Sequence, residues 1–228
     1  MFDYPKLDRI DDPLGRFYVT PSGIAPSVTT ILGTTSDDSW LDGWRARVGE
    51  EEAERIREEA AAIGTAMHES LEAHLRGTKQ PLAESETLIS GQKMARAVAK
   101  TALRRVTKIY GIEARVHYGD LYAGTADLAC EWNDSPAILD YKSGLRLKCR
   151  DTIDGYAEQC FAYSMAHDDM FGTDIRTLVV VECTRWLDVR VHVIEGDRFE
   201  AARDGWVRKL SAFYAVNPQK LLSFSSHL

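Results

Sequence analysis

The sequence predicts a mixed α/β fold built around one hydrophobic core. Three segments between residues 112 and 142 are rich in β-branched, aromatic and small apolar residues, with turn-forming residues between them. On either side, residues 51–76 and 152–167 carry apolar residues at the spacing of amphipathic helices. A chain of 228 residues with 44% hydrophobic content can bury one sizeable core. We therefore expect a single domain, with residues 1–50 as an N-terminal elaboration, 51–217 as the core and 218–228 as a tail.

The N-terminal elaboration is predicted to contain a hairpin and a short helix. The turn-forming run Pro21-Ser22-Gly23 separates two strand-like segments, residues 17–19 and 27–32. The helix that follows has one apolar face, formed by Trp40, Leu41, Trp44 and Val48, and it also carries Arg45 and Arg47. Interleaved tryptophan and arginine could grip a nucleic-acid strand, as an arch over an active site would. A buried helix seam explains these tryptophans equally well.

The helix predicted at residues 51–76 places a histidine beside its apolar stripe. The stripe consists of Ile56, Ala60, Ile63, Met67 and Leu71. His68 lies at the border of the stripe, one helical turn from Glu72. A neutral imidazole there could complete a metal site, with Glu72 as an orienting neighbour. For this helix taken alone, a surface pair between His68 and Glu72 is the simpler interpretation.

The central segment is predicted to be a β-meander with strands at residues 112–118, 121–132 and 136–142. Side chains at i and i+2 share a strand face, so Asp140 and Lys142 point the same way. Tyr141 points oppositely and offers its carbonyl near the same edge, while Asp127 lies on the middle strand. Carboxylates are ligands that Mg²⁺ prefers, and an adjacent lysine can act on water at a metal site. The pattern indicates metal-assisted hydrolysis, whereas an isolated D-x-K tripeptide is usually a solvated strand edge.

The helix predicted at residues 152–167 carries Tyr156, Gln159 and Tyr163 on one face. Glutamine can donate and accept hydrogen bonds at once, and a tyrosine can stack on a base or sugar while its hydroxyl reaches a phosphate or a lysine. Core packing is the simpler interpretation of each tyrosine alone, but a glutamine between them is unusual in a core stripe. Farther on, residues 176–184 and 186–194 are predicted as paired strands and residues 197–214 as a closing amphipathic helix.

Taken in order, these residues resemble the RecB-like branch of the PD-(D/E)XK nuclease superfamily. The matching positions are His68, Glu113, Gly124-x-x-Asp127, Asp140-x-Lys142 and Gln159-x-x-x-Tyr163. In the N-terminal half, the segments Pro26-Ser27-Val28-Thr29-Thr30-Ile31-Leu32, Trp44-Arg45 and Gly64-Thr65-x-x-His68 are similar to bacteriophage exonucleases related to the mitochondrial genome maintenance exonuclease. The resemblance covers most of the chain. It implies a restriction-endonuclease-like core, in which helices flank a central mixed β-sheet.

The resemblance also implies a metal site for Mg²⁺ or Mn²⁺. Asp127 and Asp140 are its expected principal ligands, together with the carbonyl of Tyr141. His68 is expected to bind the same ion or a second one, and Glu113 is expected to bind metal through water or to support the site. Many members carry glutamate where this chain has Asp140. The shorter side chain is expected to shift the metal or the strand slightly without changing the ligand chemistry.

The remaining matches are expected to position the reaction. Lys142 is expected to position the attacking water and to stabilise charge that develops on the phosphate. A lysine held among carboxylates stays protonated, which favours this role over that of a general base. Gln159 and Tyr163 are expected to hold the substrate strand or the lysine, and Tyr156 is a further candidate for substrate binding.

The formal net charge of −7 argues against a protein that coats nucleic acid by bulk electrostatics. An enzyme needs only a local basic lining around an acidic metal site. Candidate linings follow the D-x-K strand, at Arg146, Lys148 and Arg150, and lie on a helix predicted before the meander, at Lys100, Arg104, Arg105 and Lys108. Such charges are more often a solvated face.

The four cysteines are not spaced like cluster ligands. Cys130, Cys149, Cys160 and Cys183 form no C-x-x-C pair, so an iron–sulfur cluster is not expected. Residues 1–16 contain no apolar segment of a signal peptide, and no membrane-spanning helix is predicted. We therefore expect reduced thiols and a cytoplasmic location, which is the bacterial host cytoplasm if the protein is phage-encoded.

The sequence thus predicts a metal-dependent DNA exonuclease of phage-type recombination, repair or replication, with DNA as its partner and a recombination or replication protein as a candidate second partner. A structure-selective endonuclease on the same fold is the nearest alternative. A catalytically silent DNA-binding scaffold would be expected to lack Asp127, Asp140 or Lys142, all of which are present. A metal-dependent hydrolase of small phosphates or nucleotides is a further alternative, and its activity would not require a polymeric substrate.

Overall fold

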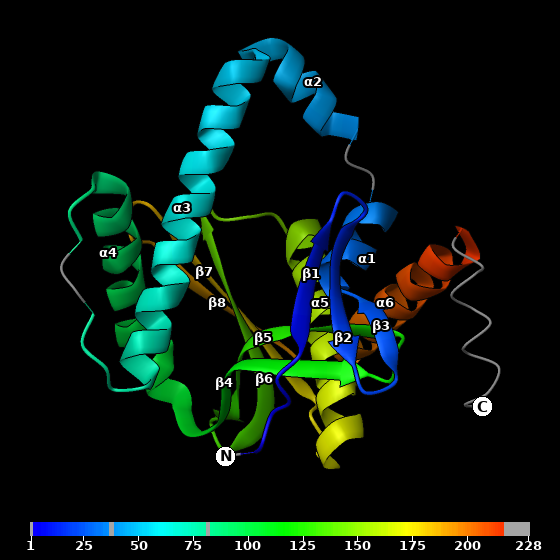
Figure 1. Cartoon of the computed structure of the whole chain (residues 1–228). Helices are drawn as coiled ribbons and strands as arrows, with labels where there is room; N and C mark the ends of the chain where they lie inside the picture. The colour runs from blue at the N-terminus through cyan, green and yellow to red at the C-terminus, as the bar shows by residue number, and fades with distance from the viewer. Residues whose placement is uncertain (1, 37–38, 81–82, 217–228) are drawn as a thin grey trace.

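A five-stranded mixed β-sheet lies at the centre of the molecule (Figure 1). The computed structural model describes residues 2–36, 39–80 and 83–216, and the predicted tail at 218–228 lies outside them. The sheet has the order β4 (Val106–Tyr118), β5 (Tyr122–Trp132), β6 (Ser135–Gly144), β7 (Thr177–Thr184) and β8 (Val189–Ile194). Neighbours are antiparallel except β6 and β7, which run parallel. The predicted fold class, a mixed sheet flanked by helices, is confirmed.

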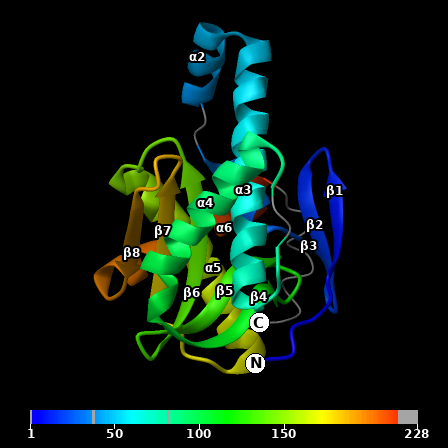
Figure 2. The same ribbon diagram turned by 90° about the vertical axis from the view of Figure 1, so that its left-hand side faces the viewer.

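Helices cover both faces of this sheet (Figures 1 and 2). Helix α5 (Arg150–Phe171) connects the parallel strands and packs on one face, with α6 (Asp197–Val216) against it. Helices α3 (Glu50–Leu75) and α4 (Glu86–Thr101) cover the other face, and a short 3₁₀ turn, η1 (Leu103–Arg105), leads from α4 into β4. Alternation along β6 explains the two cores: Ile138 packs under α5 and Leu139 under α4.

The N-terminal elaboration differs from the prediction in two respects. The predicted turn joins β2 (Gly15–Thr20) to β3 (Gly23–Pro26), and β1 (Asp8–Asp12) adds a further strand beside β2. Residues 27–32, predicted as a strand, instead begin α1 (Val28–Thr35). Ser27 is the helix N-cap, because its hydroxyl accepts a hydrogen bond from the Thr30 amide at 2.9 Å. This cap outweighs the β preference of the valine, threonines and isoleucine that follow.

Helix α2 (Ser39–Val48) and the first half of α3 project away from the sheet, as Figure 1 shows in blue and cyan. The helix predicted around Trp44 is therefore present. Leu41 and Trp44 are half-buried, whereas Arg45 and Arg47 are exposed, and the side chain of Trp40 lies outside the description. No described helix is both long and apolar enough to span a bilayer.

The basic residues predicted to share one helix before the meander are distributed over three elements. Lys100 lies near the end of α4, Arg104 and Arg105 lie in η1, and Lys108 lies in β4. The prediction that they share one helix is wrong because α4 ends at Thr101, and the β-branched residues after Arg105 continue as strand. These four residues therefore form no single helical face.

Candidate active site

A cleft of about 600 Å³ lies between α3, the end of the central sheet and the N-terminal strands. Most of the predicted site residues line it: His68, Glu113, Asp127, Asp140, Tyr141, Lys142, Gln159 and Tyr163. Tyr156, Arg146 and Lys148 are not among the lining residues. The structure therefore gathers the acids, the histidine and the lysine in one place and leaves the two basic residues of the β6–α5 loop outside it.

The cleft opens where strands β5 and β6 separate. Their hydrogen-bonded ladder extends from the pair of Trp132 and Ser135 to the pair of Leu128 and Leu139 and ends there. One residue farther, the Asp127 carboxylate accepts a hydrogen bond from the Tyr141 amide at 2.8 Å. This side chain satisfies a backbone donor that the separated strand leaves without its ladder partner. The same separation makes room for a ligand between the two strands.

His68 reaches this opening from α3. Its Nδ1 atom lies 3.3 Å from Asp127 Oδ1, and its Nε2 atom lies 3.1 Å from the carbonyl oxygen of Tyr141. Glu72 instead pairs with Arg76 at 2.8 Å, so the surface pair considered for the helix is not formed. Burial is the largest single influence and lowers the pKa of His68, but the carboxylates of Asp127, Asp140 and Glu113 together raise the pKa to about 9. A protonated imidazole with both nitrogens donating fits this geometry.

Glu113 completes the acidic side of the pocket from β4. It lies between the register pairs that join Ile112 to Leu128 and Ala114 to Ala126, and therefore opposite Asp127. Its backbone has a φ of 49°, in the left-handed region that residues other than glycine rarely adopt. Burial, and next the nearby Asp127 charge, raise the pKa of Glu113 to about 7.

Three of these side chains form a metal-compatible group. Potential ligand atoms of His68, Glu113 and Asp127 all lie within 4.8 Å of one another. Within the described ranges, this is the one such group of histidine, cysteine and acidic side chains. Cys130 and Cys183 lie in the core under α4, Cys160 lies in the core under α5, and Cys149 is exposed, so the four thiols are spread over different parts of the fold.

Asp140 and Lys142 form a buried ion pair on β6. The Lys142 ammonium lies 2.7 Å from Asp140 Oδ2, and Asp140 is only 3% exposed. Burial raises the pKa of Asp140 to about 6, although the Lys142 charge opposes this rise. Burial alone would lower the pKa of Lys142, but Asp140 and Asp127 raise it above its ordinary value. The lysine is therefore a permanent cation at neutral pH.

Helix α5 fixes the lysine through a chain of contacts. Lys142 Nζ donates to Gln159 Oε1 at 3.0 Å, and Gln159 Nε2 donates to the Tyr163 hydroxyl at 3.1 Å. The ring of Tyr156 lies 4.7 Å from the Lys142 ammonium, which is a cation–π distance. The three residues predicted on one face of this helix thus converge on the lysine, with Tyr156 beneath it rather than in the cleft.

Gly124 is required for the position of Tyr163. A Cβ atom at residue 124 would lie 2.6 Å from Tyr163 Cε1, which is inside van der Waals contact. The Tyr163 ring therefore packs directly on the backbone of this glycine. The ring in turn holds Gln159, so the small residue on β5 supports the lysine on β6 through α5.

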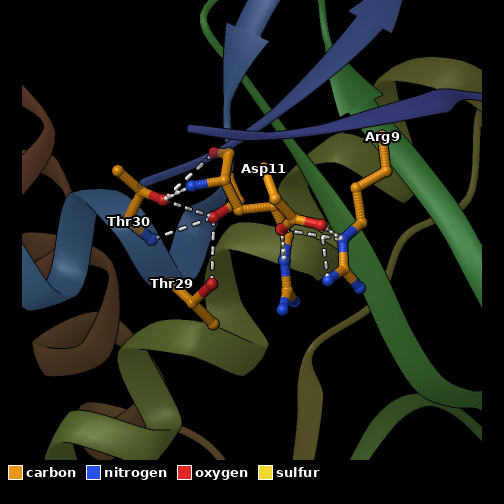
Figure 3. A network of polar contacts seen from close by, with 6 residues as sticks. Arg9, Asp11, Thr29 and Thr30 are labelled. Atoms are coloured by element: carbon orange, nitrogen blue, oxygen red, sulfur yellow. Dashed lines mark hydrogen bonds and ion pairs between the residues drawn. The ribbon is translucent and has the colours of Figure 1, made fainter. Parts of the chain in front are cut away.

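Sequence reasoning missed the N-terminal lining of the cleft. Arg9 and Arg16 line it from β1 and β2, and Thr29 lines it from α1. Figure 3 shows Arg9 beside Asp11, with Thr29 and Thr30 nearby; Arg9 and Asp11 are 2.8 Å apart. A charged segment with no apolar residues on one face resembles a loop, so local pattern offered no signal for β1.

A second buried carboxylate also escaped the sequence analysis. Glu182 on β7 is paired in register with Lys142 and is 3% exposed. It accepts a hydrogen bond from the Lys148 amide at 2.8 Å and lies 2.8 Å from His192 Nε2. Glu182 therefore ties the loop after β6 to the β7–β8 pair.

Solved structures that are similar to this chain include two distant neighbours. No family model and no curated protein matches the chain. One neighbour, from Eubacterium rectale and provisionally described as an exonuclease, has 12% identity, covers 75% of this chain and 69% of its own, and gives a TM-score of 0.47. The other, the alkaline exonuclease LHK-Exo from Laribacter hongkongensis, has 16% identity, covers 73% of this chain and 90% of its own, and gives a TM-score of 0.38. Both neighbours are described as exonucleases, in agreement with the resemblance seen in the sequence. Because both TM-scores are below 0.5, these neighbours do not establish the function of this chain.

Proposed function

We propose that this chain is a metal-dependent nuclease of the PD-(D/E)XK class that hydrolyses phosphodiester bonds in DNA. The observation that carries the proposal is the convergence of Asp127, Asp140 and Lys142 at the point where β5 and β6 separate. These three groups lie on two strands and line one cleft. Such convergence of anions around a permanent cation is typical of a catalytic site and unusual for structural ion pairs.

The donor groups fit Mg²⁺ or Mn²⁺. Carboxylate and carbonyl oxygens suit these hard ions, and one imidazole is compatible with manganese. His68, Glu113 and Asp127, whose ligand atoms lie within 4.8 Å of one another, would hold the ion together with the Tyr141 carbonyl, and Asp140, which pairs with Lys142, would complete the set. The bound ion supplies Lewis acidity, which polarises a phosphoryl oxygen and eases the ionisation of water.

The protein's own residues do the rest of the work in this proposal. Lys142 donates hydrogen bonds toward the oxygen atoms on which negative charge develops, and its position is fixed by Asp140 and Gln159. Because its pKa is raised, Lys142 acts as a positioning cation and not as a base. His68 must give up one of the protons that it donates to Asp127 and Tyr141 before it can act as a ligand.

The cleft also suits a polyanion. Arg9 and Arg16 face it from the N-terminal strands, opposite the acids, and are 48% and 41% exposed at the side chain. Guanidinium groups bind phosphate oxygens with two parallel hydrogen bonds. We infer that they bind phosphates of the strand being cut. Digestion from an end, in phage-type recombination, repair or replication, is the mode that the sequence resemblance favours.

A cleavage assay with matched substrates tests the proposal. Linear end-labelled and circular DNA, each single- and double-stranded, would be incubated with Mg²⁺, Mn²⁺ or EDTA. We expect metal-dependent loss of linear DNA and survival of circles. Cleavage of circles at junctions or flaps would indicate an endonuclease, and hydrolysis of nucleotides alone would indicate a hydrolase of small phosphates. Absence of metal-dependent cleavage from purified protein would contradict the nuclease proposal.

A further inference from the structure

The turn between β7 and β8 holds a tryptophan out in solvent. Trp186 is 80% exposed, more than any other large apolar side chain in the described part of the chain. Leu187 and Leu145, close by in the fold, are 44% and 52% exposed. Exposed apolar groups that cluster in this way are typical of a binding surface.

The turn that carries Trp186 is firmly fixed. The Thr184 hydroxyl accepts hydrogen bonds from the amides of Trp186 and Asp188, both at 3.2 Å. The Leu187 amide donates to the Thr184 carbonyl at 2.9 Å, and the Leu187 backbone has a φ of 69°. Arg185 adds an ion pair to Glu59 of α3 at 2.6 Å. A turn held by so many contacts keeps the backbone of Trp186 in a set position, which lowers the entropy lost on binding.

This turn lies next to the proposed active site. In the parallel pair of β6 and β7, Lys142 is in register with Glu182, and Gly144 with Thr184. The Arg185 amide donates to the Gly144 carbonyl at 3.1 Å, and Figure 2 shows the turn beside the segment that leaves β6. Two residues of strand rise, roughly 7 Å, separate the level of Lys142 from that of Thr184, and the turn that carries Trp186 follows directly. At roughly 3.4 Å per stacked nucleotide, a strand only a few nucleotides long reaches from the cleft to this turn.

Positive charge accompanies the exposed indole. Arg146 and Lys148 lie exposed on the loop after β6, and neither forms an ion pair within the described residues. Glu182 holds the Lys148 backbone, so this loop is fixed against the same strand that ends at Trp186. Two unpaired cations on a loop joined to the turn with an exposed indole suit a strand that offers both phosphates and base faces. A purely apolar partner would leave the cations unmatched, and an acidic partner would leave the indole unmatched.

We propose that Trp186 is a stacking platform for unpaired bases of a DNA strand that extends from the cleft, with Arg146 and Lys148 on its phosphates. This inference rests on the proposed nuclease function and adds a substrate contact outside the metal site. The platform binds bases by their faces, so it is tolerant of sequence. It also assigns Arg146 and Lys148 a place on the strand's path beyond the cleft lining.

Binding of single-stranded oligonucleotides of two lengths tests the platform. Fluorescence anisotropy would be measured in Ca²⁺, an ion that takes the same oxygen ligands, with a short oligonucleotide that fills only the cleft and a longer one that reaches the turn. Trp186→Ala is expected to weaken binding of the longer strand about tenfold and to leave the short strand unaffected. Trp186→Phe is expected to restore most of the affinity, whereas Trp186→Leu is not. Val216→Ala, at a 78% exposed position on α6, is the matched control.

Turnover of the longer substrate gives a second readout, with KM expected to rise about tenfold in Trp186→Ala and kcat unchanged. Equal affinities of wild type and Trp186→Ala for both lengths would overturn the inference while leaving the nuclease proposal intact. Equal rescue by leucine and phenylalanine would show an apolar patch for another partner and would also overturn it. A wild-type protein without metal-dependent cleavage would remove the proposed function itself.

Discussion

Two carboxylates lie at 3% exposure on the parallel strands at the centre of the sheet, and only one of them belongs to the cleft. Asp140 on β6 lies beside Asp127, Glu113 and His68, where several anionic groups face one opening. Glu182 on β7 is satisfied by a backbone amide and an imidazole and lines no part of that opening. Burial of an acid therefore does not by itself indicate catalysis.

The difference lies in how the partners are arranged. Around Glu182, one hydrogen bond comes from a main-chain group, which holds a loop in place. Around Asp140, the pKa is raised to about 6 by burial even beside a lysine, and the neighbouring Asp127 adds to this rise. Like charges held together in this way are unfavourable unless a cation joins them. The first arrangement holds a loop against the sheet, whereas the second is the one that our proposal assigns to a bound cation.

The largest expected effect separates these two acids directly. Asp140→Asn is expected to reduce metal-dependent DNA degradation on the order of 10³-fold or more, because it removes a ligand and the lysine's anchor. Glu182→Gln is expected to retain activity within a few-fold. Initial rates on linear DNA would measure both. Substantial turnover in Asp140→Asn protein with a wild-type circular dichroism spectrum would contradict the assignment.

Lys142→Met is expected to reduce kcat by about 10²- to 10³-fold with a smaller change in KM, because the lost cation acts mainly on charge that develops during reaction. The variant keeps a side chain of similar length and removes the charge that lies over the Tyr156 ring. Its effect on metal affinity should be small by comparison. A variant that lost substrate binding but kept kcat would instead place the lysine among the binding residues.

His68→Ala is expected to lower Mn²⁺ affinity about 10- to 100-fold, an effect that excess metal overcomes. The pKa of His68 is raised to about 9, so the imidazole is protonated below that pH and must lose its proton to ligate. Wild-type Mn²⁺ affinity should therefore rise with pH up to about 9, and the rise should be less steep in the variant. Calorimetric titrations at several pH values would measure this affinity. The same dependence of Mn²⁺ affinity on pH in wild type and variant would show that His68 has only a structural role.

The sequence predicted those parts of the site that depend on residues close together in the chain. Alternation along one strand placed Asp140 and Lys142 on a common face, and helical spacing placed Gln159 and Tyr163 together. These are local relations. The order of the motifs also predicted that Asp127 lies in one site with Asp140, although the sequence did not predict that strands β5 and β6 separate there or that the Asp127 carboxylate binds the Tyr141 amide.

The remaining features depend on contacts between distant segments. Glu182 lies in an apolar strand whose partner His192 is set by the β7–β8 register, which composition does not specify. Arg9 and Arg16 reach the cleft only because β1 and β2 fold over it. The prediction of a strand at residues 27–32 was wrong, because the Ser27 hydroxyl caps the start of a helix there.

The smallest expected effect on activity accompanies a measurable loss of stability. Glu182→Gln is expected to lower the free energy of unfolding by about 2 kcal/mol, because it weakens hydrogen bonds to a buried charged group. Urea unfolding would measure the change, with Glu50→Gln at the exposed start of α3 as the control. Unchanged stability would remove the contrast between the two buried acids.

Binding of Mn²⁺ to metal-free protein, measured by titration calorimetry, tests the central claim most directly. The arrangement of donors predicts that wild type and Glu182→Gln bind Mn²⁺ with the same stoichiometry and similar affinity, and that Asp127→Asn binds at least about tenfold more weakly. Failure of the wild-type protein to bind, or equal binding by Asp127→Asn, would contradict the claim that these acids form a metal site.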